Sequence, residues 1–215
     1  MNKCTDAVTW PNNLPVASVL EDIVKAAESG PVVVGAPPGS GKTLLVPAAI
    51  HETLQTGEKL VLVQPRRFAA RAIAGQIARI RQCRLGDEVG YRVRFDSKVS
   101  QATTLCVQTT GVLLRQCITN PSLSGVGCVV LDEFHERSLE MDLLIGLLKN
   151  LRETIRPDLK ILVMSATLDA DVVASYLKGA TVIRATDIVI AFSFRDEWGE
   201  RKLHGDDDDD RRQRG

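Results

Sequence analysis

Aromatic residues are scarce in this 215-residue sequence, at 4% of the total. A folded core must therefore be built mainly from Val, Leu, Ile and Ala, which suits buried parallel strands covered by helices. No stretch approaches the roughly 18 consecutive apolar residues of a membrane-spanning helix. The first ten residues also lack the apolar core of a signal peptide. These absences predict a soluble, cytoplasmic protein with no membrane partner.

Paired cysteines of the kind found in metal and redox motifs are also lacking. The chain has five cysteines, an odd number, and no two of them are spaced as Cys-x-x-Cys. Most of them fall within apolar runs, which favours buried free thiols over a disulfide framework. This pattern indicates a reducing compartment, in agreement with a cytoplasmic location.

An excess of charge of either sign is absent too, because 27 basic residues balance 27 acidic ones. Residues 195–215 hold six basic and eight acidic residues, including Asp206 to Asp210, which leaves 21 basic and 19 acidic residues upstream. So weak a bias does not by itself indicate nucleic-acid binding. The charge run is typical of a solvated, partly disordered tail. We therefore expect a lead-in over residues 1–15, one domain over 16–185, and a divergent or truncated tail over 186–215.

What the sequence does contain is a regular alternation of short apolar runs with longer helical patterns. Such alternation predicts βαβ units and a mainly parallel sheet with helices on both faces, that is, an α/β fold. The expected helices cover residues 16–28, 42–55, 68–81, 110–118, 138–152 and 169–178. The expected strands cover residues 32–34, 60–63, 89–95, 103–107, 126–131, 161–164 and 181–183.

A glycine-rich turn, residues 35–43, lies between the first expected strand and the next helix. Glycines let a backbone fold closely round phosphate oxygens, and the following helix presents its positive dipole end to the same anion. Lys42 would then reach the β- and γ-phosphates of ATP, and Thr43 would offer its hydroxyl to Mg²⁺. Ala36 replaces the first glycine of the strict motif, and a Gly/Pro-rich surface turn is the alternative interpretation. The predicted cofactor-binding residues are Gly39, Ser40, Gly41, Lys42 and Thr43.

Two acidic residues, Asp132 and Glu133, follow directly after the apolar strand that ends at Leu131. Carboxylates at the end of a buried strand are costly unless a cation lies beside them. A Mg²⁺–nucleotide complex supplies that cation, so Asp132 is the predicted metal ligand together with Thr43. Glu133 is the natural candidate to orient and deprotonate an attacking water. A helix cap is the alternative, and it explains only one of the two acids.

Several further motifs follow one another in a familiar order. The main motifs are the glycine-rich turn 35–43 (the P-loop), Asp132-Glu133-Phe134-His135 and Ser165-Ala166-Thr167. Through them the sequence resembles the DExH/DEAH-box helicases, and the HrpB-type ATP-dependent RNA helicases of bacteria above all. The similarity runs from about residue 14 to residue 177 and includes the segments 64–67 and 89–95. It implies a RecA-like P-loop NTPase domain, the first of two such lobes. The catalytic residues that it implies are Lys42, Asp132, Glu133 and His135.

The resemblance also assigns residues to nucleic-acid binding and to coupling. Arg66, Arg67, Thr110 and Gly111 would contact the backbone of a single strand, with RNA favoured over DNA, and phosphate contacts of this kind position a strand without reading its sequence. Ser165 and Thr167 would link nucleotide state to strand separation, with His135 as their partner. Taken alone, the arginines would pass as exposed residues opening a helix, and the hydroxyl residues as helix caps.

Two departures from the family pattern change what we expect of this chain. Gln76 stands where related proteins place an arginine against the adenine, which leaves base contacts unassigned. No Gln-Arg-x-Gly-Arg-type segment of a second lobe follows the first one. Because an arginine finger is worth about 10³–10⁵ in turnover, the lobe alone should bind Mg·ATP but hydrolyse it poorly. Unwinding would then need a partner chain that carries the second lobe.

Three functions remain open on the sequence. The first is the ATP-binding lobe of an RNA helicase, an ATP-hydrolysing enzyme. The second is a non-catalytic nucleic-acid-binding or regulatory module derived from a helicase, which the intact pair of acids disfavours. The third is another P-loop enzyme, such as a kinase or a transporter ATPase, which Ser165-Ala166-Thr167 and the two arginines disfavour.

Overall fold

The computed structural model describes residues 14–166 and 170–185, and all structural statements below concern these residues. Its strands are β1 (Val32–Gly35), β2 (Lys59–Gln64), β3 (Val89–Val93), β4 (Asp96–Lys98), β5 (Leu105–Thr109), β6 (Val126–Leu131), β7 (Lys160–Ser165) and β8 (Thr181–Arg184). Its α-helices are α1 (Leu20–Ser29), α2 (Lys42–Glu52), α3 (Arg67–Ile80), α4 (Thr110–Thr119), α5 (Leu139–Thr154) and α6 (Ala170–Tyr176). Two short 3₁₀ helices, η1 (Pro15–Val19) and η2 (Phe134–Glu136), complete the described elements.

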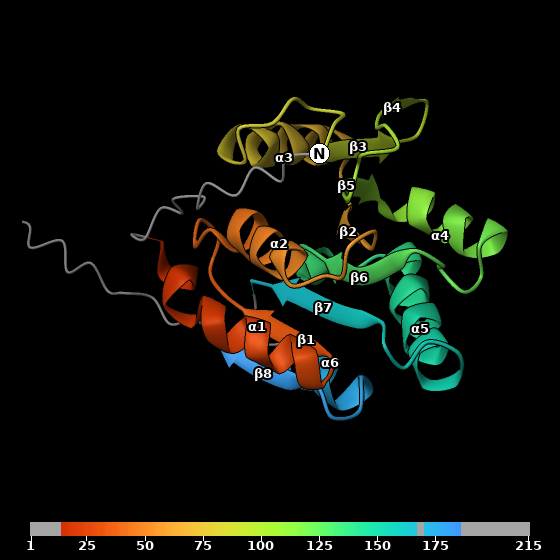
Figure 1. Cartoon of the computed structure of the whole chain (residues 1–215). Helices are drawn as coiled ribbons and strands as arrows, with labels where there is room; N and C mark the ends of the chain where they lie inside the picture. The colour runs from red at the N-terminus through yellow and green to blue at the C-terminus, as the bar shows by residue number, and fades with distance from the viewer. Residues whose placement is uncertain (1–13, 167–169, 186–215) are drawn as a thin grey trace, which may run out of the picture.

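The strands form one sheet in the order β4-β3-β5-β2-β6-β7-β1-β8 (Figure 1). Every pairing is parallel except that of β4 with β3. The carboxyl ends of seven strands therefore lie along one edge of the sheet. In open parallel sheets of this kind, ligands bind just beyond that edge.

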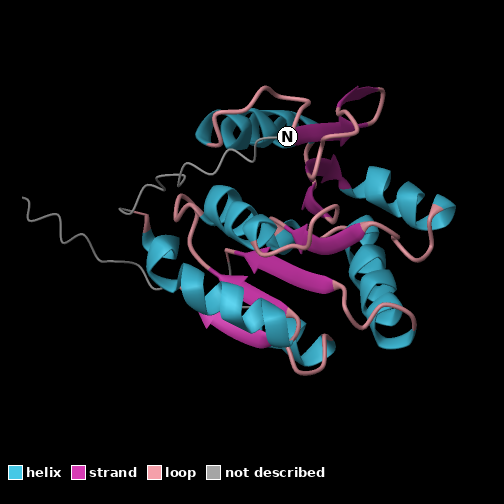
Figure 2. Ribbon diagram, in the orientation of Figure 1, coloured by secondary structure: helices cyan, strands magenta, loops and turns pink. Residues whose placement is uncertain are grey.

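Helices cover both faces of the sheet (Figure 2). Alternate residues of each strand point to opposite faces, so Val32 and Val34 pack with α1, α2 and α3, whereas Val33 packs with α4, α5 and α6. The same division holds along β6, where Cys128 and Val130 join the first core and Val129 and Leu131 the second. The predicted α/β fold with a mainly parallel sheet and helices on both faces is confirmed.

Two expected elements differ from the structure. Residues 16–28 do not form a single helix: η1 comes first, and a break at Val19 (φ −113°, ψ 6°) separates it from α1. Residues 89–95 do not form a single strand, because β3 ends at Val93 and the chain reverses into the antiparallel strand β4. The reversal places Phe95 at a positive φ of 68°.

Some predictions fall on residues outside the described ranges: the lead-in as far as residue 13, Thr167, and the tail 186–215. Within the described residues, no helix combines the length and the apolar character that crossing a membrane requires. The four cysteines in this part of the chain are free thiols, and Cys106 and Cys128 are buried as predicted, whereas Cys83 and Cys117 are only half-buried.

Candidate nucleotide site and nucleic-acid face

The loop between β1 and α2 has the backbone of an anion-binding turn. Gly39 and Gly41 adopt left-handed φ angles of 78° and 87°, which favour glycine. A Cβ atom at Gly41 would also lie 2.6 Å from Leu14 Cδ1, so the Leu14 side chain would have to move to admit a larger residue. Gly41 is also the residue that precedes α2, so the first amides of that helix open onto the loop.

The side chains of this loop lack partners that a buried group normally has. Lys42 is only 3% exposed, and its ammonium forms no ion pair with the described residues. The hydroxyl of Ser40 is buried and makes no hydrogen bond with any residue that the structure describes. A buried cation and an unsatisfied buried donor are unfavourable in isolation. A phosphate group bound in the loop would satisfy both, so these residues fit a nucleotide.

Asp132, at the end of β6, is fully buried and lies against the same loop. Its Oδ2 accepts hydrogen bonds from Thr43 Oγ1 (2.6 Å) and from Gln64 Nε2, and its Oδ1 accepts one from the Glu133 amide (2.8 Å). Burial raises the pKa of this carboxyl above its ordinary value, and the Glu133 charge acts in the same direction. The hydrogen bonds from Thr43 and the Glu133 amide, and the charge of Lys42, oppose that rise.

The Thr43 hydroxyl and the Asp132 carboxylate together offer hard oxygen ligands, which suit Mg²⁺. A protein site for this ion typically supplies one or two such ligands and leaves the remaining positions to water and to phosphate oxygens. No cluster of three or more His, Cys, Asp or Glu side chains that could hold a metal occurs among the described residues. The donor set fits a magnesium ion delivered with a nucleotide.

Glu133 occupies a strained position beside Asp132. It adopts a left-handed φ of 51°, uncommon for a residue with a side chain, and such strain is concentrated at functional sites. Its Oε2 lies 3.3 Å from His135 Nε2, and the other ring nitrogen of His135 accepts a hydrogen bond of 3.3 Å from the Ala166 amide. His135 thereby connects the turn that follows β6 to the residue that follows β7.

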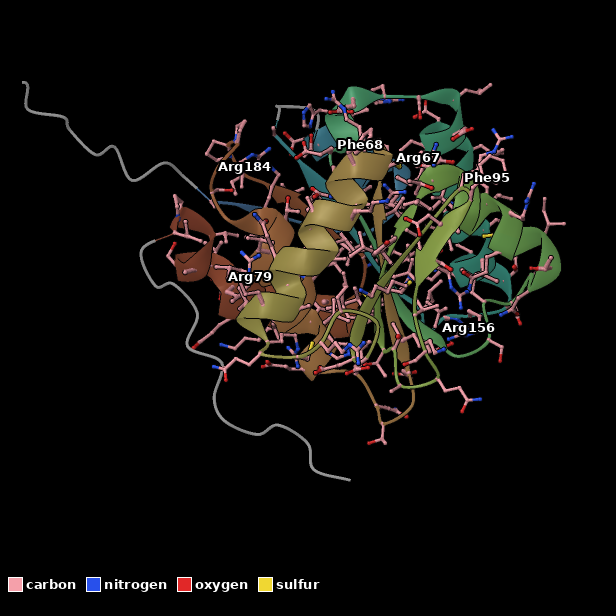
Figure 3. The ribbon with its side chains drawn as sticks, turned by 90° about the horizontal axis from the view of Figure 1, so that it is seen from above. Arg67, Phe68, Arg79, Phe95, Arg156 and Arg184 are labelled. Carbon is pink, nitrogen blue, oxygen red and sulfur yellow. The ribbon has the colours of Figure 1, made fainter. Side chains whose placement is uncertain are left out.

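Arg66 and Arg67, the arginines predicted to contact a nucleic-acid strand, lie at the start of α3, next to the β3–β4 hairpin. Arg67 donates a hydrogen bond of 2.7 Å to the Arg94 carbonyl oxygen. The Phe68 and Phe95 rings are exposed, at 84% and 87%, and Arg94 lies 4.8 Å from the Phe95 ring centroid. Figure 3 shows Arg67, Phe68 and Phe95 near one another, with Arg79 towards the other end of α3. The result is a basic face with exposed aromatic rings.

Arg66 forms an ion pair with Glu136 of η2, with a shortest separation of 2.8 Å between Nη2 and Oε1. Its side chain nevertheless remains 72% exposed. Thr110 and Gly111 are the first two residues of α4, which directly follows β5. Thr110 is only 3% exposed, so little of it is open to a ligand in this arrangement, whereas Gly111 is exposed. Thr109, the residue before α4, forms no side-chain cap on that helix.

Comparison with known proteins decides the family. The DEAD/DEAH box helicase model matches residues 17–175. The chain belongs to the DEAD/DEAH box helicase family. It is 44% identical over 173 residues to the ATP-dependent RNA helicase HrpB of Escherichia coli (strain K12), covering 80% of this chain and 21% of that protein. It is 38% identical over 186 residues to the probable ATP-dependent RNA helicase DHR2 of Saccharomyces cerevisiae (strain ATCC 204508 / S288c), covering 85% of this chain and 25% of that protein.

Solved structures place the fold in the same family. The crystal structure of Escherichia coli DEAH/RHA helicase HrpB matches with a TM-score of 0.77 and 43% identity, over 81% of this chain and 22% of that one. The fold is therefore the RecA-like helicase domain that the motifs predicted. The chain spans only about a fifth to a quarter of the length of these relatives.

Within this helicase domain, the structure brings most predicted site residues to one edge of the sheet. Lys42, Thr43, Asp132, Glu133 and His135 lie together, and His135 contacts the segment that contains Ser165 through the neighbouring Ala166 amide. The predicted link from the Ser165 and Thr167 hydroxyls to His135 stays a prediction. Thr167 lies outside the described residues.

Sequence reasoning missed three residues that the structure connects to the site. Gln64 is buried and donates to Asp132, Glu136 pairs with Arg66, and Phe95 projects from the hairpin. Gln64 belongs to the quoted segment 64–67, but its partner Asp132 is 68 positions away in the sequence, and Arg66 and Glu136 are 70 positions apart. Gln76, which stands where related proteins place an arginine against the adenine, is exposed on α3, and so is Arg79.

Proposed function

We propose that this chain is the ATP-binding lobe of an HrpB-like, ATP-dependent RNA helicase, with its domain over residues 16–185. It would bind Mg·ATP at the β1–α2 loop and couple the nucleotide to a single nucleic-acid strand on the face formed by α3 and the β3–β4 hairpin. The observation that carries the proposal is the joining of the loop to the strand end, through Thr43 and Asp132. The names of both relatives favour RNA over DNA as the nucleic acid.

In this proposal each residue of the site has a distinct task. The amides of residues 39–43 and the Lys42 ammonium hold the phosphates, while Thr43 and Asp132 hold Mg²⁺. The bound ion would neutralise charge on the phosphate oxygens. Gln64 fixes the Asp132 carboxylate by donating to Oδ2.

Glu133 is the proposed base of the hydrolysis reaction. It orients the attacking water and accepts its proton on a carboxylate oxygen, in a position held by its own amide and by His135. The contact of His135 with the Ala166 amide is the proposed path from this base to the segment that holds Ser165 and Thr167.

Single-stranded nucleic acid would lie across the basic face. Arg66 and Arg67 would contact phosphates, and the exposed Phe68 and Phe95 rings would be available for stacking with bases, a combination typical of single-strand binding. The exposed backbone at Gly111 would permit close approach of the strand, with Thr110 beside it. We further propose that a second RecA-like lobe, in this or another polypeptide, completes the site, and that the protein works in the cytoplasm, where free thiols persist.

The proposal is tested with the 215-residue chain, a fluorescent ATP analogue, and single-stranded RNA. We expect magnesium-dependent binding of the analogue, and slow phosphate release that increases when RNA is added. Failure to bind the analogue would refute the nucleotide site. Binding of RNA without any turnover, even in long incubations, would instead favour the non-catalytic module. The geometry does not support that module, because Asp132 and Glu133 are both held in place by hydrogen bonds.

A further inference from the structure

The ion pair between Arg66 and Glu136 joins the two halves of the proposed function. Arg66 immediately precedes α3 on the nucleic-acid face, whereas Glu136 belongs to η2, the single turn that follows Glu133. Both Nε and Nη2 of Arg66 contact the Glu136 carboxylate, at 3.1 Å and 2.8 Å. The two residues are 70 positions apart in the sequence.

This pair is weak enough to be exchanged for another anion. The Arg66 side chain is 72% exposed and that of Glu136 is 29% exposed, and ion pairs in such solvated positions contribute little to stability. A nucleic-acid phosphate matches the forked guanidinium as well as a carboxylate does. A phosphate that reaches Arg66 therefore competes directly with Glu136.

Release of Glu136 would act on the turn that carries the base. The Glu136 amide donates a hydrogen bond of 2.9 Å to the Glu133 carbonyl oxygen, and Phe134, between them, is buried in the core. Glu133 itself is in a strained left-handed conformation, which only its surroundings maintain. The ion pair with Arg66 is one of the contacts that hold this turn in place. Its loss would therefore alter the stability of the left-handed conformation of Glu133.

We propose that Glu136 is a positioning residue: it holds Arg66 until a nucleic-acid phosphate displaces it, and the displacement is transmitted through the η2 turn to Glu133. This inference rests on the proposed function, since it requires both a bound strand and a bound nucleotide. Because coupling between two sites is reciprocal, nucleotide binding must then alter the affinity for RNA, and Glu136 must carry part of that effect.

The decisive variant is Glu136→Gln, which keeps the shape of the side chain and removes its charge. Its matched control is Asp142→Asn, which makes the same change in the nearby Arg137–Asp142 pair (2.8 Å). Affinity for a labelled single-stranded RNA is measured by fluorescence anisotropy, for the wild type, both variants, Arg66→Ala and Arg66→Ala/Glu136→Gln. Each measurement is made with and without Mg²⁺ and a non-hydrolysable ATP analogue.

We expect Glu136→Gln to tighten RNA binding by about two- to fivefold, the size of an exposed ion pair. A misfolded variant would lose affinity instead. The gain should vanish in the Arg66→Ala background, and Asp142→Asn should not reproduce it. In Glu136→Gln, the factor by which the ATP analogue changes RNA affinity should fall towards one.

Equal gains in Glu136→Gln and Asp142→Asn, or a gain that survives in Arg66→Ala, would overturn the competition for Arg66. An undiminished effect of the ATP analogue in Glu136→Gln, or no such effect in the wild type, would overturn transmission to Glu133. If the wild-type chain binds no RNA at all, the proposed function itself fails and this inference fails with it. If the wild-type chain binds RNA normally but either of the first two results is obtained, this inference is refuted and the proposed function is not.

Discussion

Thr43 Oγ1 donates a hydrogen bond of 2.6 Å to Asp132 Oδ2, joining the start of α2 to the end of β6 across 89 residues of sequence. The two residues proposed to share Mg²⁺ are thus already in contact within the chain. Parallel pairing explains why: β1 and β6 are both paired to β7, so their carboxyl ends lie at the same edge. An ordered site of this kind needs little rearrangement to bind its ligand, which favours affinity.

Replacing Lys42 by alanine should separate nucleotide binding from folding. We expect affinity for a fluorescent ATP analogue to fall by about 100-fold or more, because charge-assisted hydrogen bonds to phosphate are lost. The chain should remain folded, with a melting temperature close to the wild-type value, because removing a buried ammonium is favourable whereas losing its charge beside the buried Asp132 carboxylate is not. Lys25→Ala, on the exposed face of α1, is the control and should bind normally. Undiminished binding by Lys42→Ala would refute the site.

Replacing Glu133 by glutamine should leave binding of the analogue intact while turnover falls by about 10²–10⁴-fold, the usual contribution of a general base. Single-turnover release of inorganic phosphate is the appropriate measurement for a slow lobe. Glu28→Gln, on α1, removes a charge far from the site and should behave as the wild type does. If Glu133→Gln still hydrolyses ATP at the original rate, another group must act as the base.

Arg67→Ala should weaken binding to single-stranded RNA to a similar extent for every sequence tested, because phosphate contacts carry no base information. The slope of log affinity against log salt should decrease by about 0.7, the value for one phosphate contact on a single strand. Arg79→Ala alters the same helix at its opposite end (Figure 3) and should leave the slope unchanged in the absence of nucleotide. A sequence-dependent loss would indicate base contacts instead.

The motifs that could be identified from sequence are those whose chemistry is local. The P-loop needs left-handed glycines just before a helix, and Gly39 and Gly41 have that conformation. The acids after β6 follow a continuous apolar run, which marks the end of a buried strand. Such features depend on a few consecutive residues, so one sequence is sufficient to find them.

Contacts between distant segments could not be predicted in this way. Nothing within residues 64–67 indicates that Gln64 donates to Asp132 or that Arg66 pairs with Glu136. The β3–β4 hairpin was missed for a different reason. Its turn places Phe95, rather than a glycine or asparagine, at a positive φ, so the aromatic and apolar residues around it resemble one continuous strand.

The opposite end of α2 gives a prediction on stability. His51 Nε2 lies 2.9 Å from Thr104 Oγ1, and its other ring nitrogen lies 3.8 Å from Glu88, too far for a hydrogen bond. Burial, together with the positive charge of Arg81, lowers the pKa of His51 to about 4, although Glu88 opposes this change. The folded chain therefore holds His51 neutral at a pH where the unfolded chain protonates it.

The sign of the pH dependence follows from this difference. The ordinary pKa of histidine is 6.5, so between about pH 6.5 and pH 4 the unfolded state binds more protons, and the free energy of unfolding falls as the pH falls. His51 should contribute up to about 3 kcal/mol to that loss. His51→Gln, which can keep the bond to Thr104, should be less sensitive over the same window. Urea denaturation at pH 7, 6, 5 and 4 tests this, and curves that stay parallel for the two proteins would exclude His51 as the source.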